Sequence, residues 1–188
     1  TGSQDVVYGV TVTDRPAVLG NAEKRVGMFI NTIPLRCSID PQKKVVDWFL
    51  DLQTNHASSK DFQSTSVSDI QRWANISGDF FDSILVFENY PMDAALASCD
   101  FLEIKNYQLR EATNYLLTID VKLEDKLQID FTFNEDLIAE EKVKGFSEQF
   151  YSIIEQIVLM ETNQLADIKL LNDSEKTMLL AFNQTEVA

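Results

Sequence analysis

The segment Val26–Arg36 reads VGMFINTIPLR, a dense apolar run rich in β-branched residues. This composition predicts a mostly buried strand over residues 25–36. Pro34 has no backbone N–H, so we expect it to end the regular pairing of that strand. Asn31 and Thr32 interrupt the run. A buried amide without partners costs about 1 to 3 kcal/mol, so Asn31 either satisfies the backbone of a loop or lines a cavity, and the residues alone favour the loop.

The segments next to this strand predict a second strand and a helix. Residues 5–12 alternate between apolar and smaller or more polar side chains, which predicts a strand followed by a loop over 13–24. Asp40-Pro41 is typical of a helix start, with Asp as the N-cap and Pro at the first helical position. The helix is expected to run to about His56, with one apolar face made of Val45, Trp48, Phe49 and Leu52.

The remainder of the chain predicts further strands and helices in alternation. Thr65 or Ser66 caps a short helix that runs through Trp73, and Asn172 with Glu175 forms a capping-box pattern at a final helix. The other expected elements are strands at 81–87, 116–123 and 127–133, an edge strand near 101–104, and a helix over about 136–160. Strands and helices mixed along one unit predict an α/β or α+β sandwich.

The charge and composition exclude several classes of partner. The 188 residues carry 16 Lys+Arg against 30 Asp+Glu, a net charge of -14, which repels phosphate backbones and anionic lipids. We therefore expect no nucleic acid and no membrane partner. No apolar run approaches the roughly 18 residues of a membrane helix, and no signal region is recognisable at the start, so we expect a cytoplasmic protein.

Few residues in this sequence have the pattern of a catalytic or metal site. The one histidine, His56, is expected at a helix end, without a nucleophile motif or a cluster of carboxylate ligands around it. Cys37 and Cys99 lack the spacing of a zinc site or a disulfide framework. The glycines form no phosphate-binding loop. We therefore assign no catalytic residue and no metal ligand.

Four blocks in order resemble the condensation domain family of nonribosomal peptide synthetases. They are residues 5–12, 26–36, 68–73 and 81–91, and VGMFINTIPLR is the most specific of them. The resemblance is to the C-terminal half of that domain. It implies a chloramphenicol acetyltransferase-like half-domain with a mixed β-sheet flanked by helices. It also implies a boundary: residues 1–171 form the subdomain, and 172–188 begin a linker towards an adenylation domain.

The resemblance implies a catalytic role without the central catalytic group. The HHxxxDG motif of the family belongs to the first half and does not occur here, so we expect this chain to be inactive alone. The residues implied to face the substrate tunnel are Asn31, Thr32 and Arg15. The family motif itself is carried by Val26, Gly27, Phe29, Ile30, Pro34 and Arg36.

The resemblance also implies partners. The reaction would join carrier-bound aminoacyl or peptidyl thioesters into an amide, with substrates held on the phosphopantetheine of carrier domains and no cofactor bound by this chain. The partners would be the N-terminal half of the domain, peptidyl carrier domains and a downstream adenylation domain. The alternatives are half of an epimerisation domain, a noncatalytic docking module of the same fold, or an acidic α/β interaction domain.

Overall fold

The computed structural model of the chain describes residues 2–13, 20–21, 24–88, 113–123, 126–159 and 163–183. Over these residues it contains five strands, four α-helices and two short 3-10 helices. Contacts between residues divide the chain into two units. The first comprises Thr1–Val6, Arg36–Phe62 and Ile138–Ala188, and the second comprises Val7–Leu35 and Gln63–Leu137.

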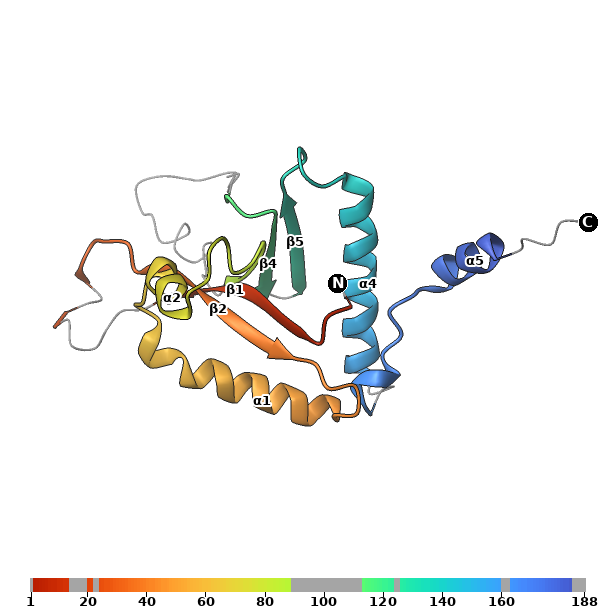
Figure 1. Cartoon of the computed structure of the whole chain (residues 1–188), viewed down its shortest axis with the longest axis horizontal. Coiled ribbons are helices and arrows are strands. Elements are labelled where there is room, and N and C mark those ends of the chain that lie inside the picture. The colour runs from red at the N-terminus through yellow and green to blue at the C-terminus, as the bar shows by residue number, and fades with distance from the viewer. Residues whose placement is uncertain are drawn as a thin grey trace, which may run out of the picture. The chain divides into compact units, whose positions relative to one another are not determined.

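The strands form one mixed sheet with the order β2-β1-β3-β4-β5 (Figure 1). β1 pairs in parallel with β3, β3 pairs in parallel with β4, and β4 pairs in antiparallel fashion with β5. The predicted α/β class with a mixed sheet is therefore confirmed. The strand bounds are Asp5–Thr13 for β1, Ile30–Ser38 for β2, Ser83–Glu88 for β3, Leu117–Leu123 for β4 and Leu127–Phe133 for β5.

The second unit has its core around the pairing of β1, β3 and β4. Gly9 of β1 lies opposite Ile84 of β3, and Phe81 packs beside them with 6% of its surface exposed. In β5 Ile129 is buried whereas Gln128 and Thr132 are exposed, so one face of that strand is in contact with solvent. This unit also contains helix α2, Val67–Ala74.

The first unit contains the remaining helices. Hydrogen bonds join the start of α1 to the segment around η3: Leu165 N–H donates to Lys43 O at 3.0 Å and Val45 N–H donates to Asn163 O at 3.0 Å. None of the helices in the described part of the chain is long and apolar enough to cross a bilayer. The bounds are Val45–Ser58 for α1, Lys60–Phe62 for η2, Glu140–Val158 for α4, Leu165–Asp167 for η3 and Asp173–Phe182 for α5.

The strand predicted over residues 25–36 is shifted. β2 begins at Ile30, and Val26 and Met28 before it are exposed by 104% and 92%, so the prediction of a buried strand is wrong for its first residues. Pro34 does not end the pairing either, because β2 continues to Ser38. β2 is the first strand in the sheet order, and an edge strand tolerates a residue that cannot donate to a neighbour.

The helix predicted to start at Asp40-Pro41 begins later. Asp40 Oδ1 accepts a hydrogen bond from the Gln42 N–H at 3.0 Å and so closes a turn, and α1 starts at Val45. A similar turn precedes α4, since Asn134 Oδ1 accepts a hydrogen bond from the Asp136 N–H at 3.0 Å. This helix was predicted from about residue 136 and starts at Glu140. The edge strand predicted near 101–104 lies outside the described residues.

Candidate functional site

The Val26–Arg36 block spans the entry to β2 and most of that strand. Side chains alternate between the two faces of a strand, so Asn31, Ile33 and Cys37 share one face and Thr32 lies on the other. Ile33 and Cys37 are each 4% exposed, which identifies the face of Asn31 as the inward one. Asn31 and Thr32 are both half-buried. Because they lie on opposite faces of β2, a cavity on either face could be lined by only one of them.

Asn31 is tied to the loop that leads into α2. Its Nδ2 donates to Gln63 O at 2.7 Å and to Thr65 O at 2.8 Å. Asn31 therefore donates hydrogen bonds to the backbone of a loop, which is the role that the sequence favoured for it. The next residue, Ser66, caps α2 by accepting a hydrogen bond from the Asp69 N–H at 3.1 Å, as predicted.

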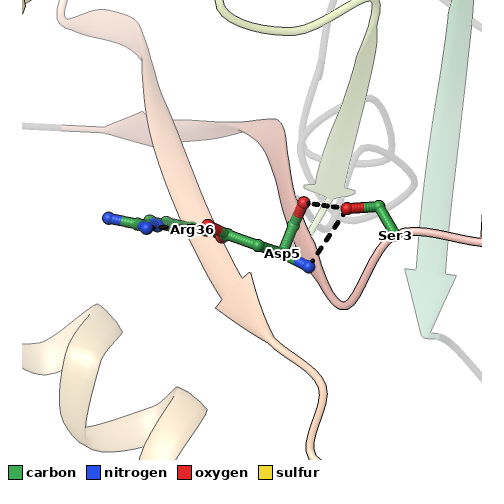
Figure 2. A network of polar contacts seen from close by, with 3 residues as sticks. All are labelled: Ser3, Asp5 and Arg36. Carbon is green, nitrogen blue, oxygen red and sulfur yellow. Dashed lines mark hydrogen bonds and ion pairs between the residues drawn. The ribbon is translucent and has the colours of Figure 1, made fainter.

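Arg36, at the end of the block, is engaged in a bidentate ion pair. Its Nε and Nη2 donate to the two carboxylate oxygens of Asp5 at 2.9 and 2.7 Å, while Ser3 Oγ donates to Asp5 O and accepts from Asp5 N–H (Figure 2). The Arg36 hydrogen bond lowers the pKa of the Asp5 carboxyl, and the same contact raises the pKa of Arg36. Both groups are exposed, so this pair locally fixes the start of β1 and adds little stability.

His56, the single histidine, is the one side chain of its kind that could act as a general base. His56 lies half-buried in the last turn of α1, and its imidazole makes no hydrogen bond or ion pair with any described residue. In the same part of the chain no three His, Cys, Asp or Glu side chains gather in a way that would hold a metal ion.

Cys37 is a buried thiol rather than a nucleophile. Burial is the largest influence and raises its pKa, the charge of Asp5 raises it further, and a hydrogen bond with Trp48 opposes both. The thiol therefore stays protonated near neutral pH, which removes its reactivity. Cys99 and the tunnel candidate Arg15 lie outside the described residues.

A cavity of about 250 Å³ lies beside the first turns of α1 in the first unit. Its walls are mostly polar, and two of the residues that line it, Lys43 and Asp51, form an ion pair. Trp48 donates its indole N–H to Ser38 O at 2.9 Å. These groups include no activated nucleophile and no metal cluster, so the cavity has no recognisable chemistry. The lining residues are Ser38, Asp40, Lys43, Trp48, Asp51, Leu52 and Asn55.

A charged network that the sequence analysis missed crosses three strands of the second unit. Lys122 of β4 lies 3.2 Å from a carboxylate oxygen of Glu88 in β3 and 3.8 Å from one of Asp130 in β5. Burial lowers the pKa of Lys122, but the ion pairs with Glu88 and Asp130 and the charge of the buried Asp120 raise it by more. Only the strand register brings these residues together, since Lys122 pairs with Glu88 in the β3–β4 ladder.

The fold is that of the condensation domains of nonribosomal peptide synthetases. A four-domain nonribosomal peptide synthetase bound to AMP and glycine matches with a TM-score of 0.77 at 12% identity, over 92% of this chain and 14% of that one. The starter condensation domain of rhizomide synthetase, as a variant in complex with C8-CoA and Leu-SNAC, matches with a TM-score of 0.74 at 21% identity, over 92% of this chain and 40% of that one.

The chain belongs to the Condensation domain family, whose sequence profile matches residues 1–180. A linear gramicidin synthase protein of Brevibacillus parabrevis is 32% identical over 187 residues, which cover 97% of this chain and 2% of that protein. Bacitracin synthase 3 of Bacillus licheniformis is 31% identical over 188 residues, covering 98% of this chain and 3% of that protein. The chain therefore spans a small fraction of the length of these relatives.

Proposed function

We propose that this chain is the C-terminal half of a condensation domain that forms amide bonds in nonribosomal peptide synthesis. The observation that carries the proposal is the family match over residues 1–180 in a sequence with one histidine, which cannot contain the paired histidines of HHxxxDG. The size of the match supports it, because the chain corresponds to 38 to 41% of the solved condensation-domain chains.

In the proposed reaction the α-amine of the acceptor attacks the thioester carbonyl of the donor. A C–N bond forms, the C–S bond breaks, and the proton lost by the amine balances the charge of the departing thiolate. The first half supplies the histidine that positions or deprotonates the amine. This chain supplies one wall of the tunnel, with Asn31 and Arg15 as its substrate-facing residues. Thr32 lies on the opposite face of β2 and belongs, with the rest of the Val26–Arg36 block, to their frame.

The proposed partners follow from this arrangement. Both substrates arrive on phosphopantetheine arms of carrier domains, so the chain itself binds no cofactor, and the reaction takes place in the cytoplasm. Residues 172–188 begin the connection to an adenylation domain. Their first helix, α5, opens with a capping box: Asn172 Oδ1 accepts from Glu175 N–H at 2.8 Å and Glu175 Oε2 accepts from Asn172 N–H at 2.8 Å.

Reconstitution tests the proposal. The chain alone and the complete two-half domain are each supplied with a donor and an acceptor aminoacyl group on carrier domains, and the carrier-bound products are measured by mass spectrometry. We expect a dipeptide on the acceptor carrier with the complete domain and none with the chain alone. Turnover by the chain alone would contradict the half-domain assignment. Inversion of the donor α-carbon without amide formation would indicate an epimerisation domain. If neither the chain alone nor the complete domain gives any reaction, the protein is a docking module.

A further inference from the structure

Helix α4 carries a glutamine that holds the backbone of the segment after η3. Gln156 pairs with Lys169 in both directions: its Nε2 donates to Lys169 O at 3.0 Å, and its Oε1 accepts from Lys169 N–H at 2.9 Å. The same Nε2 lies 3.2 Å from Ser152 O, one turn earlier in α4. A flipped amide would place oxygen against oxygen, so these partners settle the orientation of Gln156. The side chain thus satisfies both polar groups of one residue, as a neighbouring antiparallel strand does.

A second glutamine, Gln149, lies seven residues earlier on the same face of α4. Residues with this spacing are two helical turns apart, about 10 Å along the axis. Gln149 Nε2 donates to Glu175 Oε1 at 2.8 Å, while Glu175 Oε2 accepts the Asn172 N–H of the capping box. One oxygen of the Glu175 carboxylate therefore binds α4 and the other binds the first turn of α5. Gln149 and Gln156 are both half-buried, so water competes with their bonds less than at an exposed site.

The strap is the segment 169–175 that these two glutamines hold. Its first residue is bound near the end of α4, and its last residue is bound two turns nearer the start of that helix. The strap therefore runs back along α4. It contains the boundary expected between residues 171 and 172, so the first turn of α5 is attached to the same unit as α4.

Helix α5 gains little stability from its own length and packing. It has ten residues, and isolated helices shorter than about 12 to 15 residues are marginal in water. Its large apolar side chains are 49% to 72% exposed, so they bury little surface. Its first turn, with the capping box and the contact to α4, is therefore its main support. These apolar residues are Met178, Leu179, Leu180 and Phe182.

We propose that the strap couples the folding of α5 to α4 through Gln149 and Gln156. While both contacts hold, Glu175 is fixed and its capping box starts α5. When they open, the strap leaves α4 and α5 unfolds with it, while the strands and the other helices stay folded. The strap is thus a conformational switch at the end of this unit, and it operates independently of the amide-forming reaction of the proposed function.

Trypsin cleavage followed by mass spectrometry tests the switch on the chain. Trypsin cuts after lysine, and Lys169 and Lys176 place one cleavage site in the strap and one in α5. Gln149→Ala and Gln156→Ala each remove a contact to α4. We expect each variant to speed cleavage after Lys176 by about 5- to 10-fold, because cleavage follows the population of the open form. Gln156→Ala should speed cleavage after Lys169 by a similar factor.

A matched variant removes the same kind of bond elsewhere. Gln71 in α2 donates its Nε2 to Gly78 O at 2.9 Å in the second unit. Gln71→Ala should change cleavage after Lys176 by less than twofold. The switch is overturned if Gln71→Ala speeds this cleavage as much as the α4 variants do, or if neither α4 variant speeds it. If Gln156→Ala does not fold, Gln156→Glu replaces it, since its carboxylate still accepts from Lys169 N–H but cannot donate to Lys169 O.

Hydrogen exchange in peptides from β4 separates local from global opening. In the variants of α4, exchange in β4 should match that of the unmodified chain, because only the strap and α5 open. An equal rise of exchange in β4 and in α5 would show that the whole chain unfolds, and it would overturn the switch.

Discussion

Replacing Gly9 by alanine tests the packing of the sheet at the glycine where an added Cβ would lie closest to other side chains. Gly9 is buried in β1 opposite Ile84. A Cβ at this position would lie 2.4 Å from Cε2 of Phe81 and 2.7 Å from Cγ2 of Ile84. The Phe81 ring is itself stacked on Tyr115, with centroids 5.5 Å apart and planes at 26°, so the ring cannot move away without breaking a second contact.

The size of the effect follows from these distances. Carbon atoms pack best at roughly 3.5 to 4.0 Å, so the new methyl group overlaps Phe81 by more than about 1 Å. Inserting a methyl group into a packed core costs about 1 to 3 kcal/mol. Alanine restricts the unfolded chain more than glycine, which returns about 0.4 to 1 kcal/mol. We expect Gly9→Ala to lower the free energy of unfolding by about 1 to 2 kcal/mol.

Urea denaturation followed by tryptophan fluorescence and far-ultraviolet circular dichroism measures the change. Gly145 in α4 provides the control, since a Cβ there meets no atom within 4 Å. Alanine at that helix-interior position should raise the free energy of unfolding by about 0.5 to 1 kcal/mol. The reasoning is refuted if Gly9→Ala is as stable as the unmodified chain, or if Gly145→Ala is destabilised as much as Gly9→Ala.

Three further perturbations probe single interactions. Ser66→Ala removes the cap of α2 and should cost about 1 kcal/mol in urea denaturation, whereas a change below about 0.3 kcal/mol would show that the cap is dispensable. Lys122 has a raised pKa, so its pairing stabilises the fold below about pH 10 and is lost as the pH rises through the folded pKa. The stability difference between the unmodified chain and Lys122→Gln should therefore shrink as the pH rises above about 10, and a difference that stays constant would contradict the ion pairing. Asp5 has a lowered pKa, so its pairing with Arg36 is present above about pH 4 and is lost in acid. In acid titrations followed by circular dichroism, the unmodified chain should lose its advantage over Asp5→Asn below about pH 4, and an advantage that grows in acid would contradict this sign.

The elements predicted correctly are those whose signals are local. β1 and the β4–β5 hairpin show the period-2 pattern within a few residues, and the structure places all three strands. The caps Ser66 and Asn172 were also predictable, because the capping oxygen and the N–H it accepts from are three residues apart. Patterns of this kind depend on no distant part of the chain.

The errors arise where a distant segment decides the structure. α1 begins at Val45, whose N–H donates to Asn163 O, and the neighbouring Lys44 forms a β-bridge with Gln164. No local signal near Asp40-Pro41 contains this information, so the Asx turn at Asp40 resembles a helix cap in the sequence. The prediction of a buried strand over Val26 and Met28 is wrong for a related reason. Their apolar side chains favour a buried strand, and no local pattern in the sequence indicates that both are exposed.

The sequence singles out candidate residues in the Val26–Arg36 block, but it does not give their geometry. A polar pair inside an apolar run identified Asn31 and Thr32 as unusual, and the run alone left a loop contact and a cavity as alternatives. The structure assigns the nitrogen of Asn31 to the loop, which is the alternative that the residues alone favoured. Because β2 is extended through both residues, Thr32 lies on the opposite face, and the two polar side chains cannot act on one substrate from the same side of the strand.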